Sequence, residues 1–467
     1  MFSQEHVTKE VDSKAPRHYG EENPTKDHPS ANNSYKTTLA IMSPPRILVS
    51  GASVAGPALA YWLVKAGCKV TIVERSRVLR TEGQGIDVRD SARDVIRKMG
   101  IFDIMRERSS QEEGVRVFTA GGKTLAAFGA DLESGNANSF SCDIEILRGE
   151  LAGILYDITK DDVEYVFGDY VKSLEETEKD VTVTFANGLP NRTFDLLIAA
   201  DGIGSKIRGM ISGKSYSKAV KSLNSYVSYF SIPKLATEDK WAELCWREGG
   251  RSLWLRPDNV GRTRVFLMTV AYSADDKRLD RYAEVCKSDI PAQKALTKEL
   301  FQDFGWQVDR VLEGMEKSDD FYMQHVAQTR IDKWTSPMGR VGLVGDAAAC
   351  PSPFTGMGTS LAFIESYIMA GEISKQLDDL PAALIAYEKV VRPYVEDTQK
   401  LFPGIPWILN PQTSWGLGIF QSVIGLFGFI AGTRVAAVVN KIVDSVPKSW
   451  FGSDFKLPHY KAFEDKE

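Results

Sequence analysis

Hydrophobic positions near the start of the ordered sequence alternate between short apolar runs and a segment with helical spacing. Arg46–Ser50 is a short apolar run, residues 57–65 have the spacing of a helix, and Lys69–Glu74 is a second apolar run. Short apolar runs bounded by glycine indicate buried strands, whereas apolar residues three and four apart indicate a helix. The three segments therefore predict a compact β-α-β unit, with Pro57 in the first turn of the helix.

The same patterns predict further helices and strands along the chain. Helical spacing is found at 90–108, 145–155, 275–317 and 357–377. Strand-like runs are found at 114–128, 163–200, 222–272 and 340–344. Residues 401–433 contain no charged side chain, and their second half is apolar and rich in glycine. This stretch predicts either a helical hairpin packed on the main domain or a segment that touches a membrane.

The first 44 residues are polar, with scattered charges and no apolar periodicity, which predicts a disordered tail. They lack the apolar core of a secretory signal, and their acidic residues argue against a mitochondrial presequence. We therefore expect a cytoplasmic protein. Met42 stands just before the first strand, which raises the hypothesis that translation begins there.

Composition and charge narrow the classes of protein that the chain can belong to. Its 467 residues are 43% hydrophobic and 25% charged, as in ordinary globular proteins. The net charge of -5 and the lack of a basic run argue against a nucleic-acid partner. The five cysteines are widely spaced, and only two of the five histidines lie outside the tail. This pattern disfavours a disulfide framework, a metal site and Ser-His-Asp catalysis.

The first motif that carries chemistry is the turn Gly51-Ala-Ser53-Val-Ala-Gly56. Gly51 permits a tight turn, Gly56 permits close helix–strand packing, and the helix N-terminus offers free N–H groups to a pyrophosphate. Ser53 is small enough for the backbone to approach the phosphates. Glu74 ends the next strand, where an acid accepts hydrogen bonds from a ribose. A nucleophile elbow has the same strand-turn-helix context, but the chain lacks a matching downstream histidine.

Two later strands also lead into a neighbouring aspartate and glycine, Asp201-Gly202 after the first strand and Gly345-Asp346 after the second. Asp201 follows the run Leu196–Ala199 and Asp346 follows residues 340–344. Asp201 alone would also fit the cap of the next helix. After Asp346, Gly356 and Gly358 lead into a helix whose N-terminus places partial positive charge where a reduced flavin carries negative charge.

These three motifs in this order resemble the FAD-dependent aromatic hydroxylases, which include para-hydroxybenzoate hydroxylase and the tetracycline-inactivating monooxygenases. The resemblance extends over about 46–400 and includes Gly85-Ile-Asp87-Val-Arg89, Arg148-Gly-Glu-Leu151, Arg392-Pro393 at the expected end of a helix and, more weakly, Leu457-Pro458. It implies FAD contacts at Gly51, Ser53, Gly56, Glu74, Asp87, Arg89, Arg148, Asp201, Asp346, Gly356 and Gly358. The sequence departs from the family at Ser53, which replaces a glycine, and at Cys350, to which we assign no catalytic role.

The resemblance also implies the chemistry. In this family NADPH or NADH reduces the flavin, and one oxygen atom of O2 is then transferred to an electron-rich substrate. We expect hydroxylation or epoxidation of a hydrophobic, aromatic or polycyclic small molecule of secondary metabolism. Residues expected to line the substrate site are Tyr226, Tyr229, Trp246, Arg247, Trp254, Arg256, Tyr322 and His325. Among them, Tyr226, Tyr229 and His325 are candidates for acid–base catalysis.

The implied fold is α/β, with a Rossmann-type FAD-binding domain, an interleaved mixed β-sheet substrate domain and a C-terminal helical segment. The predicted parts are a tail (1–44), the first FAD-binding part (45–215), the substrate domain (216–330), the second FAD-binding part (331–400) and an apolar helical region (401–467). The first FAD-binding part is expected to contribute strands to the middle sheet. Three alternatives stay open: a flavin-dependent dehydrogenase or reductase, a halogenase, and a non-catalytic binding protein held to a membrane by residues 401–433. The halogenase alternative is disfavoured because this chain lacks the Trp-x-Trp-x-Ile-Pro signature of such enzymes.

Overall fold

The computed structural model describes residues 43–80, 83–129, 144–213, 216–401, 404–431 and 455–464. Residues 1–42, which include the predicted tail and the hypothetical start at Met42, lie outside this description. So does the C-terminal stretch 432–454. The described elements all belong to one compact unit, Pro44–Glu467.

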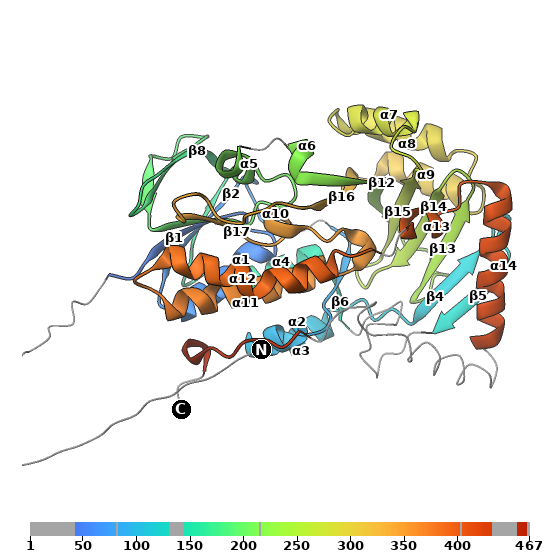
Figure 1. The fold of residues 1–467 in the computed structure, drawn as a ribbon. Coiled ribbons are helices and arrows are strands. Elements are labelled where there is room, and N and C mark those ends of the chain that lie inside the picture. Colours follow the sequence, from blue (N-terminus) through green and yellow to red (C-terminus); the bar gives the residue numbers. More distant parts are fainter. Residues whose placement is uncertain are drawn as a thin grey trace, which may run out of the picture. The chain divides into compact units, whose positions relative to one another are not determined.

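A five-stranded sheet forms the first half of the fold (Figure 1). Its strands in spatial order are β17 (Val341–Leu343), β11 (Leu196–Ala199), β1 (Arg46–Ser50), β2 (Lys69–Glu74) and β7 (Glu164–Phe167). Every neighbouring pair is parallel. Parallel sheets are covered on both faces, which explains why these strands are continuous apolar runs. The long helices of this half are α1 (Ala55–Lys65), α11 (Gly358–Lys375) and α12 (Leu380–Thr398), with α1 packed on α11 and α11 on α12.

Smaller elements connect this sheet to the rest of the molecule. A two-stranded ribbon pairs β3 (Gly85–Asp87) with β6 (Glu145–Leu147), and a three-stranded sheet contains β8 (Val171–Glu176), β9 (Val181–Phe185) and β10 (Arg192–Phe194). The short helices are α2 (Ala92–Lys98), α3 (Phe102–Glu107), α4 (Arg148–Asp157), α5 (Lys206–Ser212), α6 (Tyr216–Ala219) and α10 (Asp346–Ala349). Two 3-10 turns are η1 (Pro353–Thr355) and η3 (Lys461–Phe463).

A seven-stranded mixed sheet forms the second half. Its spatial order is β16 (Tyr322–Thr329), β12 (Val220–Pro233), β15 (Arg262–Val270), β14 (Arg251–Pro257), β13 (Trp241–Arg247), β4 (Gly114–Phe118) and β5 (Thr124–Gly129). Only β13 and β4 pair in parallel. The helices α7 (Lys277–Val285), α8 (Ile290–Phe301) and α9 (Val308–Lys317) contribute to a hydrophobic core with one face of this sheet. Because β4 and β5 come from the first part of the chain, the predicted α/β class with an interleaved mixed sheet is confirmed.

Three local predictions need correction. The segment predicted as one helix at 90–108 is divided into α2 and α3, because Gly100 has a φ of 73° that ends the first helix. The segment 145–155 begins as strand β6, which pairs with β3, and becomes helical only at Arg148. Pro393 lies inside α12 instead of near its end, and the helix continues to Thr398 because Tyr394, Val395 and Thr398 are buried in the core.

The apolar C-terminal stretch forms the short helix α13 (Ile405–Ile408) and the long helix α14 (Ser414–Ala431). Because one helix is very short, the stretch is not a hairpin of two packed helices. Leu417, Phe420 and Ile424 of α14 pack against the seven-stranded sheet around Trp246. In the described part of the chain, no helix is long and apolar enough to cross a membrane.

Candidate active site

The turn between β1 and α1 requires glycine at both of its ends. Gly51 has a φ of 114°, and its N–H donates to the Val73 carbonyl at 2.8 Å. A Cβ at Gly51 would lie 2.5 Å from the Ala200 carbonyl oxygen, and a Cβ at Gly56 would overlap the Gly51 carbonyl. Between them Ser53 is exposed. The turn thus leaves an open cradle at the N-terminus of α1, which is suited to a phosphate group.

Glu74 is fixed beside this cradle by two backbone N–H groups. One carboxylate oxygen accepts from Ala52 at 2.9 Å, and the other accepts from Ser76 at 2.8 Å. The first of these bonds ties the end of β2 to the turn after β1. The structure therefore places the predicted ribose-binding acid next to the predicted pyrophosphate site.

Asp201, which follows β11, contains a buried oxygen without a partner. Its Oδ1 has no hydrogen bond within the described residues, and burial raises the pKa of the carboxyl group. An unsatisfied buried oxygen of this kind is costly, and a bound hydroxyl group would satisfy it. Together with the glycine cradle, this unpartnered acceptor fits a cofactor that carries ribose or ribityl hydroxyls, as FAD does.

Arg208 joins the second and third motifs. Its side chain is buried, and its guanidinium donates to the Ile203 carbonyl at 2.5 Å and to the Ala347 carbonyl at 2.9 Å. Ser205 caps α5 by accepting from the Arg208 backbone at 3.0 Å. The loops after β11 and β17 are thus held together by one residue whose structural role the sequence motif did not indicate.

The loop that opens α11 lies beside two predicted acids. A Cβ at Gly358 would lie 4.0 Å from an Asp346 carboxylate oxygen, and a Cβ at Gly356 would lie 4.0 Å from one of Asp87. Gly356 also has a φ of 64°, which favours glycine. The remaining predicted residue nearby, Arg89, pairs with Asp87 at 2.6 Å. The predicted residues therefore gather around the loop that opens α11, namely Asp87, Arg89, Asp346, Gly356 and Gly358.

Glu365 of α11 holds the residue before Asp346 in place and was not among the predicted site residues. One carboxylate oxygen accepts from the Gly345 N–H at 2.6 Å and from the Tyr387 hydroxyl at 3.1 Å. Burial raises the pKa of Glu365 to about 8. The only signal in the sequence was an acid within the otherwise apolar first half of this helix.

The seven-stranded sheet separates the predicted catalytic residues onto two faces. Adjacent β12 and β16 place Tyr226 opposite His325 and Tyr229 opposite Tyr322. Tyr226 stacks on Tyr282 of α7 and on His325, with ring centroids 4.9 and 5.0 Å apart. Because successive residues of a strand point to opposite faces, Tyr229 faces away from these helices. This corrects the expectation that Tyr226, Tyr229 and His325 share one site.

Tyr229 and Tyr322 lie on the face that meets the loop before α11. Their rings stack at 4.9 Å, and Phe354 of η1 packs against the apolar cluster that contains Tyr229 and Met268. Burial raises the pKa of both tyrosines, that of Tyr322 to about 12, and the nearby charge of Arg148 offsets part of this rise. Both hydroxyls are therefore protonated at neutral pH and can donate hydrogen bonds.

The other residues predicted to line the substrate site are divided as well. Trp246 and Trp254 share the face of Tyr229, and Trp246 contacts Phe420 of α14 with ring centroids 5.3 Å apart. Arg247 instead binds the Phe304 carbonyl at 2.9 Å, beyond the end of α8. His325 donates to or accepts from Ser222 at 2.8 Å, and burial lowers its pKa.

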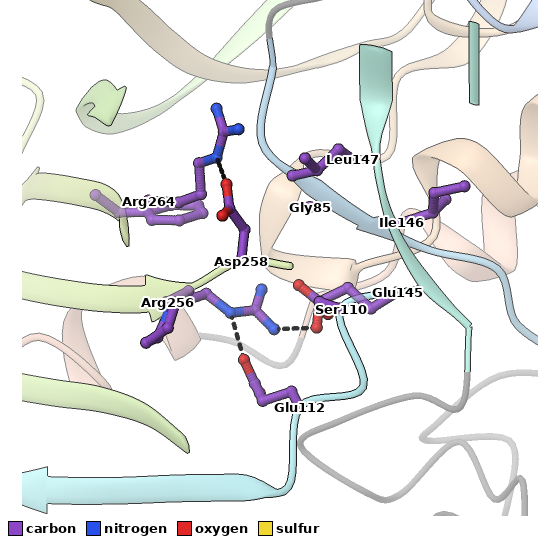
Figure 2. A pocket seen from close by; sticks show the side chains of 11 residues that line it. Gly85, Ser110, Glu112, Glu145, Ile146, Leu147, Arg256, Asp258 and Arg264 are labelled. Atoms are coloured by element: carbon purple, nitrogen blue, oxygen red, sulfur yellow. Dashed lines mark hydrogen bonds and ion pairs between the residues drawn. The ribbon is translucent and has the colours of Figure 1, made fainter. Parts of the chain in front are cut away.

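Arg256 lies in a buried charge cluster beside the β3–β6 ribbon. Figure 2 shows the small pocket that this cluster lines. Its volume is about 10 Å³, which is room for about one water molecule. Arg256 binds Glu112 and Glu145, while Arg264 binds Asp258. The burial of Glu145 raises its pKa to about 8, and Arg256 offsets part of the rise.

Three strand ends open on one edge of a parallel sheet, and an apolar face of a mixed sheet lies beside them; together they define a flavin-dependent oxidoreductase fold. The chain belongs to the FAD binding domain family, which matches residues 46–399. Its cofactor is FAD, and it is an FAD-dependent monooxygenase. The resemblance to the FAD-dependent aromatic hydroxylases is thereby confirmed.

Individual relatives cover nearly the whole chain. It is 32% identical to the FAD-dependent monooxygenase asL4 of Sarocladium schorii over 438 residues, which is 89% of this chain and 98% of the relative. It is 34% identical to the monooxygenase CTB7 of Cercospora beticola, with 87% and 98% covered. The crystal structure of the tetracycline destructase Tet(51) is similar with a TM-score of 0.67 and 30% identity, covering 90% of this chain and 99% of that one.

Proposed function

We propose that this monooxygenase uses NADPH or NADH and O2 to hydroxylate or epoxidise a hydrophobic, aromatic or polycyclic small molecule of secondary metabolism. One contact carries the substrate part of the proposal. Phe354, between Asp346 and α11, packs against the sheet face that holds Tyr229 and Met268. The predicted cofactor loop and an aromatic wall therefore adjoin, which suits a large apolar substrate.

The proposed cofactor residues bind and orient FAD, which supplies the redox chemistry and oxygen activation when bound. The Gly51–Gly56 turn would hold the pyrophosphate at the N-terminus of α1, with Ser53 at its open side. Glu74 would accept hydrogen bonds from the adenosine ribose. Asp346 and Asp201 would accept from ribityl or ribose hydroxyls, which would satisfy the unpartnered Asp201 oxygen.

On the substrate side, the chain would provide hydrogen-bond donors in a water-poor wall. The protonated hydroxyls of Tyr229 and Tyr322 would donate to an oxygen of the substrate. The positive charge of Arg148 would stabilise a phenolate or enolate, which is more electron-rich than the neutral compound. Apolar neighbours such as Phe266 would exclude water from the reacting atoms.

The test uses the purified holoenzyme and a panel of polycyclic phenols. We expect a two-band flavin spectrum, NADPH oxidation stimulated by some members of the panel, and a product that contains one atom from ¹⁸O-labelled O2. Naphthalene derivatives without a hydroxyl group are the matched control. NADPH oxidation without label in any product would mean that none of these phenols is oxygenated, and it would overturn the proposed substrate class.

We further propose that this enzyme is cytoplasmic and that α14 rests on a membrane surface. On α14, Trp415 is 78% exposed and Phe429 is 73% exposed, and Leu426 and Phe427 are exposed between them. Solvent-exposed apolar side chains on a helix without charges favour insertion into the interfacial region of a bilayer.

Flotation with phosphatidylcholine–phosphatidylserine vesicles tests this contact. We expect the wild type to float with the vesicles and Trp415→Ser/Phe429→Ser to stay in solution. Val260→Ser, which removes an exposed apolar residue of the turn between β14 and β15, is the control and should float. A wild type that stays in solution but dimerises with rising concentration would assign the α14 surface to a second copy.

A further inference from the structure

The proposed function does not use the charge cluster around Arg256. The guanidinium Nε donates to Glu112 at 3.0 Å, and Nη2 donates to Glu145 at 2.6 Å (Figure 2). The side chains of both acids are only 5% exposed, and that of Arg256 is 19% exposed. A single arginine therefore compensates two buried carboxyl groups.

Glu145 belongs to the ribbon that presents the proposed FAD residues. It lies opposite Asp87 in the β3–β6 pairing, and Arg148 follows β6 directly. A Cβ at Gly85 would overlap the Glu145 carboxylate, so this acid rests on the neighbouring strand. The position of Glu145 is therefore linked to the positions of Asp87 and Arg148.

Arg256 belongs to the seven-stranded sheet, near the end of β14. Strand β14 pairs with β13 and β15 in the seven-stranded sheet. The neighbouring cluster, in which Arg264 binds Asp258 and Asp320, is different because all three residues lie in or beside that sheet. Ser109 and Ser110, in the segment before β4, bond the backbone of Glu145. Within the cluster of Figure 2, Arg256 is the side chain that links the Glu145 carboxylate of the β3–β6 ribbon to β14.

We propose that Arg256 is a positioning residue that fixes the β3–β6 ribbon, and with it Asp87 and Arg148, against the substrate sheet. The planar guanidinium spans two carboxyl groups through two different nitrogens, which a lysine ammonium cannot reproduce. Without this cation both acids would be buried without compensation, and separation of ribbon and sheet would relieve them. The consequence for the reaction rests on the FAD placement proposed above.

The charges around Glu145 agree with this role. The charges of two cations, Arg256 and Arg89, and of two other acids, Glu112 and Asp87, act on the Glu145 carboxyl group. With a proton on Glu145, Arg256 and Glu112 form a balanced pair. Loss of Arg256 would leave the cluster with excess negative charge beside Asp87.

The experiment measures amide hydrogen exchange of residues 83–89 and 144–151, first in the apoprotein and then with FAD. For Arg256→Met we expect exchange of both segments to rise at least about tenfold, with β1 and β2 unchanged. The FAD dissociation constant, measured by flavin fluorescence, should rise about tenfold as well. Arg256→Lys should lie between wild type and Arg256→Met. Arg281→Met, which removes an exposed pair with Glu299, is the matched control and should behave as wild type.

The double variant Arg256→Met/Glu112→Gln separates positioning from stability. It removes the acid that loses its compensating cation when Glu145 carries a proton, so its melting temperature should recover, whereas the ribbon should still exchange rapidly because the contact of Arg256 with Glu145 is absent. The proposal would be overturned if the ribbon of Arg256→Met exchanged at the wild-type rate. If Arg256→Met fails to fold, the same result in the double variant would overturn it. A wild type that binds no FAD would instead contradict the proposed cofactor site and leave the exchange result interpretable.

Discussion

The two large sheets carry their chemistry in different places. In the five-stranded parallel sheet, the residues of the predicted site follow the strand ends, at Gly51, Asp201 and Asp346, and the strands that precede them, β1, β11 and β17, are mainly apolar. In the seven-stranded sheet, the polar and aromatic groups lie in the middle of strands, as do Tyr226 and Tyr229. Groups at strand ends converge because parallel strands end at one edge. Groups within strands are assigned to a site only by the face on which they lie.

Substitution at a strand end should have the largest effect. In Gly56→Ala the new methyl group would overlap the Gly51 carbonyl, so the turn must open. We expect FAD affinity to fall by about 100-fold or more, since the phosphate cradle depends on this close approach. Gly204→Ala is the matched control, because a Cβ there meets no atom within 4 Å. Equal FAD affinity of the two variants by fluorescence titration would refute the assignment.

Removal of one hydroxyl from each face of the mixed sheet should have an intermediate effect. Tyr229→Phe should lower kcat/KM by about 10- to 100-fold, because a buried donor to the substrate is lost. Tyr226→Phe should change it less than about twofold, because this ring packs against Tyr282 on the helix-covered face. Steady-state oxygenation of a substrate found in the panel checks both. If Tyr226→Phe lowered kcat/KM more than Tyr229→Phe does, the substrate would be assigned to the helix-covered face instead.

Glu365, the buried acid of α11, should have a smaller effect, on a stability that depends on pH. Burial raises the pKa of Glu365 from its ordinary 4.5 to about 8, so the folded protein retains a proton that the unfolded chain has lost. The unfolding free energy should therefore decrease as pH rises from about 4.5 to about 8 and then level off.

In Glu365→Gln this decrease should be smaller by about 1 kcal/mol or more, as measured by urea unfolding at pH 5 and pH 8. The residual slope should come partly from Glu145, whose pKa is raised to a similar value. Glu299→Gln, an exposed acid of α8, is the control and should leave the slope unchanged. An unchanged slope in Glu365→Gln would mean that Glu365 is ionised in the folded protein.

The predictable part of the site was local in sequence. Gly51, Gly56 and Glu74 belong to one β-α-β unit, and each aspartate follows a short apolar run, so their positions at strand ends could be read directly. The helix 358–375 was also predicted closely, because its apolar residues recur through 18 positions. Local hydrogen bonding and side-chain spacing decide such features, and both are written into consecutive residues.

The unpredicted part depends on residues far apart in the chain. Arg256 is separated by 144 positions from Glu112 and by 111 from Glu145, and Arg208 reaches Ala347 across 139 positions. Their roles arise from contacts and not from any short pattern. The separation of Tyr226 and His325 from Tyr229 likewise required the strand register, because a shift of one residue would exchange the two faces.

The sequence alone therefore determined the α/β class and the strand-end motifs, because these follow from local spacing and chain order, and the kind of cofactor followed from the family that these motifs resemble. Tertiary structure decided which aromatic residues adjoin the cofactor loops, which buried acids are compensated, and where α14 packs. The physical reason is that burial and strand pairing are properties of the assembled sheets, in which the free energy of each side chain depends on partners from distant segments.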